Sequence, residues 1–154
     1  MSKNKHITIE NVTVIDAGAK GKSIAKAPDG RVIFISNAIP GDVVDVQTTK
    51  KKSAYYEGFV TKYHQLSEQR VTPVCSHFGY CGGCKWQDMN YQSQLFYKQK
   101  EVENNLVRLG RIEIPAVMPI IGSDETYYYR NKMEFSFSDM RWLTPDEIKK
   151  ADEI

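Results

Sequence analysis

Apolar and β-branched residues come in short runs over the first 65 positions, and residues that favour turns separate the runs. Asp-Ala-Gly at 16–18, Pro-Asp-Gly at 28–30 and Pro-Gly at 40–41 each interrupt the pattern, as does a run of three lysines. The pattern predicts five strands, over residues 7–15, 23–27, 32–36, 42–49 and 54–63. Strands this short cannot build a deep sandwich, but they can close into a small OB-like barrel.

A helical period replaces the alternation after residue 90. One apolar stripe carries Leu95, Val102, Leu106 and Leu109. This stripe predicts a helix over residues 91–109. Asp88 or Asn90 can cap its start, and Gly110 can end it in a left-handed conformation.

Alternation returns after Pro115 and predicts strands over residues 117–121 and 127–138. In the second strand, the three consecutive tyrosines at 127–129 are expected to include at least one buried side chain. A further helix is expected to begin at Pro145, preceded by a capping threonine. The fold class is therefore α+β: a five-stranded barrel, a cysteine loop, a helix and the first strands of an incomplete central domain. The expected domain boundaries are 1–65, 66–90 and 91–154.

The chain has three cysteines, which lie within ten residues of one another: Cys75, Cys81 and Cys84. An odd number of closely spaced cysteines argues against a disulfide framework and for a metal site. Gly82 and Gly83 allow the loop to fold back and to direct backbone N–H groups at sulfur. Structural zinc and cubane iron-sulfur centres both take four protein ligands, so a fourth ligand has to come from elsewhere.

The residue types alone leave several readings of this loop open. His77 could complete a zinc site with three cysteines and one histidine, because zinc and iron-sulfur centres both accept thiolates. A thiol redox sensor without metal is a third alternative. Phe78 could shield a metal from water or protrude and stack on an unpaired base. Trp86 is expected in a core.

The chain has 154 residues and a formal net charge of +2. Its charge is uneven, since residues 1–74 carry 11 Lys or Arg against 7 Asp or Glu, and residues 75–154 carry 10 against 12. No stretch approaches the roughly 20 apolar residues of a membrane helix, and the first residues do not resemble a secretion signal. A cytoplasmic protein without a membrane partner is expected.

Seven residues are candidates for contact with RNA: Lys50, Lys51, Lys52, Phe78, Arg130, Asn131 and Lys132. Lysine and arginine can neutralise phosphates, asparagine can hydrogen-bond a base edge, and phenylalanine can stack on one. The lysine run is equally compatible with a solvated turn, and residues 130–132 with a polar strand edge.

Four segments together resemble iron-sulfur RNA uracil-5-methyltransferases, in particular the 23S ribosomal RNA branch. The β-rich part, with Gly18-Ala-Lys-Gly-Lys22 and Ile39-Pro-Gly-Asp42, is similar to a TRAM domain, an OB-like RNA-binding module. The others are Cys75-x5-Cys81-Gly-Gly-Cys84-Lys-Trp-Gln87, the helix from Tyr91-Gln-Ser-Gln-Leu95 to Leu106-Val-Arg-Leu-Gly110, and Tyr129-Arg-Asn-Lys-Met-Glu-Phe135.

The resemblance implies a 4Fe-4S cluster held by the three cysteines, with its fourth ligand outside this chain. It also implies an S-adenosylmethionine-dependent enzyme in which a cysteine thiolate adds to C6 of a uracil before C5 is methylated. The chain has no spare cysteine and no glycine-rich cofactor turn, so no catalytic or cofactor-binding residue is expected in it, and it should be inactive alone. The expected partner is ribosomal RNA, and the expected state is a monomer. The alternative is a stand-alone zinc-stabilised RNA-binding module without enzymatic activity.

Overall fold

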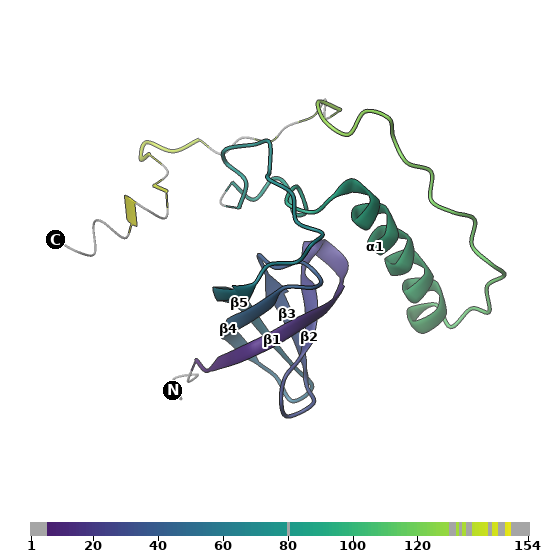
Figure 1. Cartoon of the computed structure of the whole chain (residues 1–154), viewed down its shortest axis with the longest axis horizontal. Helices are drawn as coiled ribbons and strands as arrows, with labels where there is room; N and C mark the ends of the chain where they lie inside the picture. Colours follow the sequence, from purple (N-terminus) through teal and green to yellow (C-terminus); the bar gives the residue numbers. More distant parts are fainter. Residues whose placement is uncertain are drawn as a thin grey trace.

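The computed structural model describes residues 6–79, 81–129, 132, 134, 137–141, 143–144 and 147–148. Its first part is a closed barrel of five strands in the order β1-β2-β3-β5-β4 (Figure 1). The strands are β1 (Thr8–Ala17), β2 (Ser23–Lys26), β3 (Val32–Ser36), β4 (Val43–Lys51) and β5 (Tyr55–Gln65). All neighbours are antiparallel except β3 and β5, which are parallel. The predicted OB-like barrel is confirmed.

Alternation along the strands fills the barrel, because every second side chain points inward. The apolar side chains with no exposed surface are Ala25, Ile33, Ile35, Val44 and Val46. β4 and β5 approach each other closely at Gly58, where an added Cβ would lie 2.4 Å from the carbonyl oxygen of Gln47. Only a glycine fits at this contact without moving a strand.

The two ends of the barrel differ in what lies on them. The strand directions place residues 17–23, 36–43 and 63–66 at one end, called here the loop-facing end. Residues 27–31 and 52–54 lie at the opposite end, called the far end. The cysteine loop and the helix pack on the loop-facing end (Figure 1).

The helix predicted over residues 91–109 is present as α1 (Tyr91–Asn104), followed by a π-helical turn (Asn105–Leu109). Asn90 is the N-cap, and its side-chain oxygen accepts a hydrogen bond from the N–H of Ser93 at 2.9 Å. The expected left-handed stop at Gly110 is wrong, since its φ is −72° and its N–H bonds to Asn105 O in the π turn. Arg111 takes the positive φ instead.

The expected apolar stripe does not make the contact between helix and barrel. Tyr97 is the buried residue of α1, and it packs with Ala17, Ile39 and Met89 in a second small core that half-buried Trp86 flanks. Trp86 thus lies in a core, as predicted. An ion pair of 2.8 Å between Lys100 Nζ and Asp16 Oδ2 adds a polar link between α1 and β1.

Residues 111–129 run back along α1 without regular structure. The N–H of Ile120 donates to Gln99 Oε1, and the N–H of Ser123 donates to the Tyr91 hydroxyl, both at 2.8 Å. The predicted strand at 117–121 is therefore wrong: its backbone bonds to helix side chains and has no neighbouring strand among the described residues.

The described part of the predicted strand 127–138 is also irregular. Tyr127, Tyr128 and Tyr129 are all exposed, so the expectation of a buried tyrosine is not met.

Near the end of the chain, Thr144 donates from its N–H and its hydroxyl to Glu147 Oε2, at 2.8 and 3.0 Å. The bond from the Thr144 N–H to the Glu147 carboxylate is one half of the capping box found at helix N-termini. Glu147 and Ile148 are helical, whereas Pro145, where that helix was predicted to begin, lies outside the described residues. Among the helices that the structure describes, none has the length and apolar character needed to cross a membrane.

Candidate nucleic-acid interface and metal loop

A short two-stranded contact closes the base of the cysteine loop. Arg70 and Met89 form an isolated antiparallel bridge. On either side of it, the N–H of Val71 donates to Asp88 O and the N–H of Asn90 donates to Gln69 O, both at 2.9 Å. The cysteines lie between these two segments, so their loop leaves and rejoins the barrel at one place.

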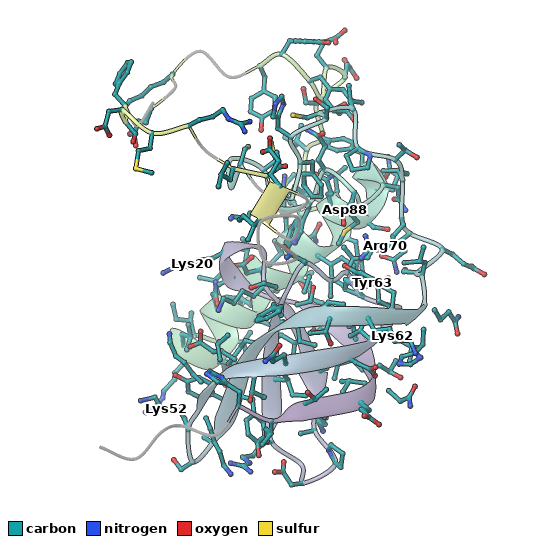
Figure 2. All side chains as sticks on the ribbon, turned by 90° about the vertical axis from the view of Figure 1, so that its left-hand side faces the viewer. Lys20, Lys52, Lys62, Tyr63, Arg70 and Asp88 are labelled. Atoms are coloured by element: carbon teal, nitrogen blue, oxygen red, sulfur yellow. The ribbon has the colours of Figure 1, made fainter. Side chains whose placement is uncertain are left out.

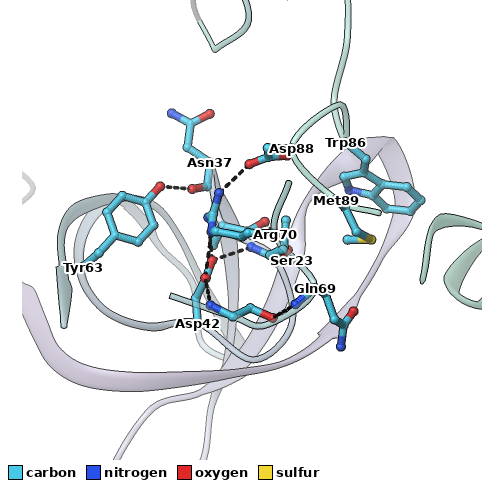
Figure 3. Close-up of polar contacts among 12 residues, drawn as sticks. Ser23, Asn37, Asp42, Tyr63, Gln69, Arg70, Trp86, Asp88 and Met89 are labelled. Carbon is cyan, nitrogen blue, oxygen red and sulfur yellow. Dashed lines mark hydrogen bonds and ion pairs between the residues drawn. The ribbon is translucent and has the colours of Figure 1, made fainter. Parts of the chain in front are cut away.

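A buried ion cluster ties this base to the barrel (Figure 3). Asp42 is completely buried and accepts four hydrogen bonds: the N–H groups of Ile39 and Ser67 at 2.8 and 2.9 Å, and Arg70 Nε and Nη2 at 2.9 and 2.6 Å. Arg70 Nη1 also donates to Asp88 Oδ2 at 2.6 Å. One guanidinium thus joins the β3–β4 turn to Asp88, three residues before α1 begins.

Both carboxylates of this cluster pair with the single guanidinium of Arg70. Burial opposes the charge on Arg70, but the hydrogen bonds and charges of Asp42 and Asp88 outweigh it and raise the arginine pKa above its usual value. Burial raises the pKa of Asp88, and the adjacent guanidinium of Arg70 opposes that rise. The ring of Tyr63 faces the same guanidinium, 5.1 Å from its centre, and its hydroxyl donates to Asn37 O.

The cysteine loop carries hydrogen bonds aimed at sulfur. Gly82 has a φ of +74°, and the N–H of Gly83 lies 3.4 Å from Cys81 Sγ, as the Gly-Gly pair predicts. The Gln87 side chain holds both ends of the loop: its oxygen accepts the N–H of Cys75 at 2.7 Å, and its nitrogen lies 3.8 Å from Cys84 Sγ. Such donors stabilise negative charge on thiolates.

All three cysteines are exposed and unpaired thiols. Within the part of the chain that is described, no three His, Cys, Asp or Glu side chains are close enough to hold a metal ion. The donor set nonetheless suits a metal centre with thiolate ligands, because three cysteines in one loop are accompanied by N–H donors directed at sulfur. His77 Nδ1 lies 3.2 Å from the Ser76 hydroxyl. The zinc and iron-sulfur readings both remain predictions.

A groove of about 340 Å³ lies between the loop-facing end of the barrel and the cysteine loop. Three lysines, two aromatic rings and one amide side chain are among its lining residues: Lys20, Lys22, Lys85, Tyr63, Phe78 and Asn37. The two walls touch at Gly21, where an added Cβ would lie 2.3 Å from Lys85 Cβ. The positive φ of Gly21, +69°, also favours glycine.

The residues predicted to contact RNA do not gather at one place. Lys50, Lys51 and Lys52 lie at the end of β4, and Figure 2 shows Lys52 at the far end of the barrel, away from Tyr63, Arg70 and Asp88. Lys50 pairs with Glu57 at 3.3 Å. Phe78 is half-buried and lines the groove, which leaves both of its predicted roles possible.

The remaining candidates belong to the last predicted strand. Arg130 and Asn131 lie outside the described residues. Lys132 is exposed, with its Nζ 4.0 Å from Glu134 Oε1. Lys20, Asn37, Tyr63 and Lys85 were not predicted as RNA contacts. Lys20 could have been noticed, because it lies in the glycine- and lysine-containing turn Gly18-Ala-Lys-Gly-Lys22 between two predicted strands.

Comparisons with known proteins agree with this architecture. The family profile described as "TRAM domain" matches residues 3–61, which include almost the whole barrel. A protein of Bacteroides thetaiotaomicron named "Uncharacterized RNA methyltransferase" is 54% identical over 132 residues, 86% of this chain and 29% of that protein. One of the same name from Porphyromonas gingivalis is 43% identical over 139 residues, 90% of this chain and 30% of that protein.

A third relative carries a more specific name. The 23S rRNA (uracil(1939)-C(5))-methyltransferase RlmD of an Acidovorax species is 37% identical over 131 residues, 82% of this chain and 27% of that protein. The chain thus spans less than a third of the length of these relatives. Residues 3–61 match a TRAM domain, and most of the chain is similar to a part of these RNA methyltransferases that makes up 27–30% of each.

Proposed function

We propose that this chain is the RNA-binding part of an S-adenosylmethionine-dependent enzyme that methylates C5 of a uridine in 23S ribosomal RNA. The observation that carries the proposal is the continuity of the match, since similarity to RNA methyltransferases extends beyond the TRAM barrel through the cysteine loop and the helix. A stand-alone barrel would account only for residues 3–61.

The described residues support a role in binding and positioning. The Asp42–Arg70–Asp88 cluster fixes the cysteine loop on the barrel, so that loop and barrel present one surface. Methyl transfer to C5 of uracil requires a nucleophile and a base. The three cysteines lie together in one loop, and we assign them to metal binding. The chain alone is therefore expected to bind RNA without methylating it.

A 4Fe-4S cluster is the metal centre that we propose for Cys75, Cys81 and Cys84, with one further ligand from outside this chain. When bound, it would cross-link the loop. Gly83 and Gln87 would stabilise the bound sulfurs through the contacts described above. Cys81→Ser should abolish uptake of iron and sulfide during anaerobic reconstitution and leave the thermal unfolding of the barrel unchanged. Stoichiometric zinc without sulfide would instead support the zinc-binding alternative.

The methyltransferase proposal is tested in cells. Disruption of the gene should remove one 5-methyluridine from 23S ribosomal RNA, measured by mass spectrometry of nuclease digests, and re-expression should restore it. Unchanged 5-methyluridine in the disrupted strain, with the gene shown to be expressed in the parent, would overturn the assignment.

A further inference from the structure

The groove between barrel and cysteine loop has the size of a site for one small ligand. Its volume of about 340 Å³ is at the lower end of the range of about 300–1,000 Å³ typical of ligand sites. The barrel contributes one wall, through the turn at 20–22, residues 36–38 and Tyr63. The other wall is the loop, through Phe78, the nearby glycines, Cys84 and Lys85.

Two of the lysines that line this space have no carboxylate partner in the described part of the chain. Lys22 pairs with Glu57 at 2.9 Å, and Asp88, which also lines the groove, pairs with Arg70 at 2.6 Å, a guanidinium that it shares with Asp42. Lys20 and Lys85 have no carboxylate partner among residues 6–79 and 81–129. Two uncompensated ammonium groups on opposite walls favour an anionic ligand.

The backbone at the rim is strained at two positions that are not glycine. Lys20 has a φ of +60° and Asn37 has a φ of +65°, and both line the groove. Strain of this kind is concentrated at binding and catalytic sites, because the surrounding structure has to maintain it. Figure 3 shows the Asn37 amide directed away from the buried cluster, while its carbonyl accepts the Tyr63 hydroxyl. The amide group has no hydrogen-bond partner among the described residues, so it can pair with a ligand.

Two aromatic side chains complete the lining. Tyr63 is 41% exposed, and the guanidinium of Arg70 lies 5.1 Å from its ring centre. Phe78 enters the groove from the loop wall. Aromatic faces beside cations suit an unpaired nucleotide, since bases stack on rings and ammonium groups contact phosphates.

We infer that this groove binds one unpaired nucleotide of single-stranded RNA. The base stacks on Phe78, the flanking phosphates contact Lys20 and Lys85, and the Asn37 amide contacts the base edge. The inference depends on the proposed RNA-binding function. It places the main contact at the loop-facing end of the barrel and not at Lys50, Lys51 and Lys52.

The test measures binding of a fluorescently labelled single-stranded RNA of about twelve nucleotides by anisotropy over a range of salt concentrations. The groove variant is Lys20→Gln with Lys85→Gln, and the matched control is Lys51→Gln with Lys52→Gln. Both remove two charges. Glutamine keeps the Cβ and Cγ groups through which Lys85 contacts Gly21, so the walls stay packed.

The groove variant should lose roughly tenfold or more in affinity, and the slope of log affinity against log salt should become shallower by about 1.4, or about 0.7 for each lost phosphate contact. The control should change affinity by less than about twofold. Phe78→Leu should weaken binding roughly fivefold or more at every salt concentration, because a stacking contact is not ionic. Duplex RNA of the same sequence should bind more weakly than the single strand.

The outcomes separate the two proposals. If the unmodified chain fails to bind RNA, both the proposed RNA-binding function and the groove assignment are refuted. If it binds but the groove and control variants lose affinity equally, only the groove assignment fails. The same holds if Phe78→Leu binds normally or if duplex RNA binds as tightly as single-stranded RNA. Circular dichroism melting curves of each variant show whether a loss reflects unfolding.

Discussion

The barrel and the segment after the helix contain similar apolar residues, yet only the barrel buries them. Ile33 and Ile35 have no exposed surface, whereas Ile121 is 93% exposed and Met118 is 83% exposed. The two regions differ in the neighbouring strands available to them. Each barrel strand has a hydrogen-bonded neighbour on both sides, because the sheet closes on itself. Residues 111–129 lie beside a single helix.

This contrast shows what an alternating pattern does and does not determine. Alternation selects which face of a strand is apolar, but the strand forms only where another strand satisfies its backbone N–H and C=O groups. The exposed apolar side chains at 118–121 form no core with the described residues. The barrel should therefore be stable through its own core, and residues 111–129 should contribute little to its stability.

The largest effect is expected at the junction of the two regions. Asp42→Ala removes the acceptor of four hydrogen bonds and leaves Arg70 with Asp88 as its one carboxylate partner among the described residues. Removal of one partner from a buried ion pair costs about 3–5 kcal/mol. The free energy of unfolding, measured with urea, should fall by that amount. Proteolysis of the cysteine loop should also become faster. The control Asp124→Ala alters an exposed carboxylate and should have no measurable effect. A loss below about 1 kcal/mol for Asp42→Ala would mean that the cluster does not join barrel and loop.

The same substitution in each region tests the comparison directly. Ile33→Ala should lower the free energy of unfolding by about 2–5 kcal/mol, because it leaves a cavity in the closed barrel. Ile121→Ala removes the same atoms from an exposed position and should change it by less than about 0.5 kcal/mol. Chemical denaturation followed by circular dichroism gives both values. Similar losses for the two variants would show that residues 118–121 pack in solution.

The barrel strands were predictable from sequence because the signals that mark them, turn residues and alternation, lie within each strand or next to it. Turn residues such as Pro40-Gly41 separate runs whose period of two marks the buried face, and the five observed strands lie within a few residues of those predicted. Asn90 and Gly82 were predictable for the same reason. A capping side chain and a left-handed glycine each act within three residues of their own position.

The junction and the groove were not predictable, because their partners are distant in sequence. Arg70 meets Asp42 across 28 residues and Asp88 across 18, and neither pairing has a local signal. The groove combines a turn of the barrel with a loop that follows about 60 residues later, so Lys20 and Lys85 share no recognisable motif. The apolar stripe of the helix failed as a guide for a different reason. Tyr97 makes the barrel contact and lies off that stripe.

A smaller effect is expected where the loop wall touches the barrel. Gly21→Ala forces an L-residue into a φ of +69° and brings its Cβ against Lys85. A strained backbone of this kind costs about 1–3 kcal/mol. The added methyl should displace the loop and leave the barrel folded. Hydrogen exchange should therefore rise in the cysteine loop and stay unchanged in β3. Gly30 provides the control, because its φ of +84° is similar but a Cβ added there would have no neighbouring atom within 4 Å. Gly30→Ala should therefore lower stability without affecting the cysteine loop.

The smallest effect concerns acid stability at the far end of the barrel. The Arg31 side chain, and secondarily the Tyr56 hydroxyl, donate to Asp29 and lower its pKa below the usual value of 3.8. The folded state therefore binds this proton less tightly than the unfolded state. Its contribution to stability is present above about pH 3.8 and is lost as the pH falls toward the lowered folded pKa. Asp29→Asn removes that contribution. The variant should be less stable than the unmodified chain at neutral pH, and the gap should narrow as the pH falls below 3.8. Urea unfolding over this range measures the gap, and a constant gap would show that Asp29 keeps its ordinary pKa in the folded barrel.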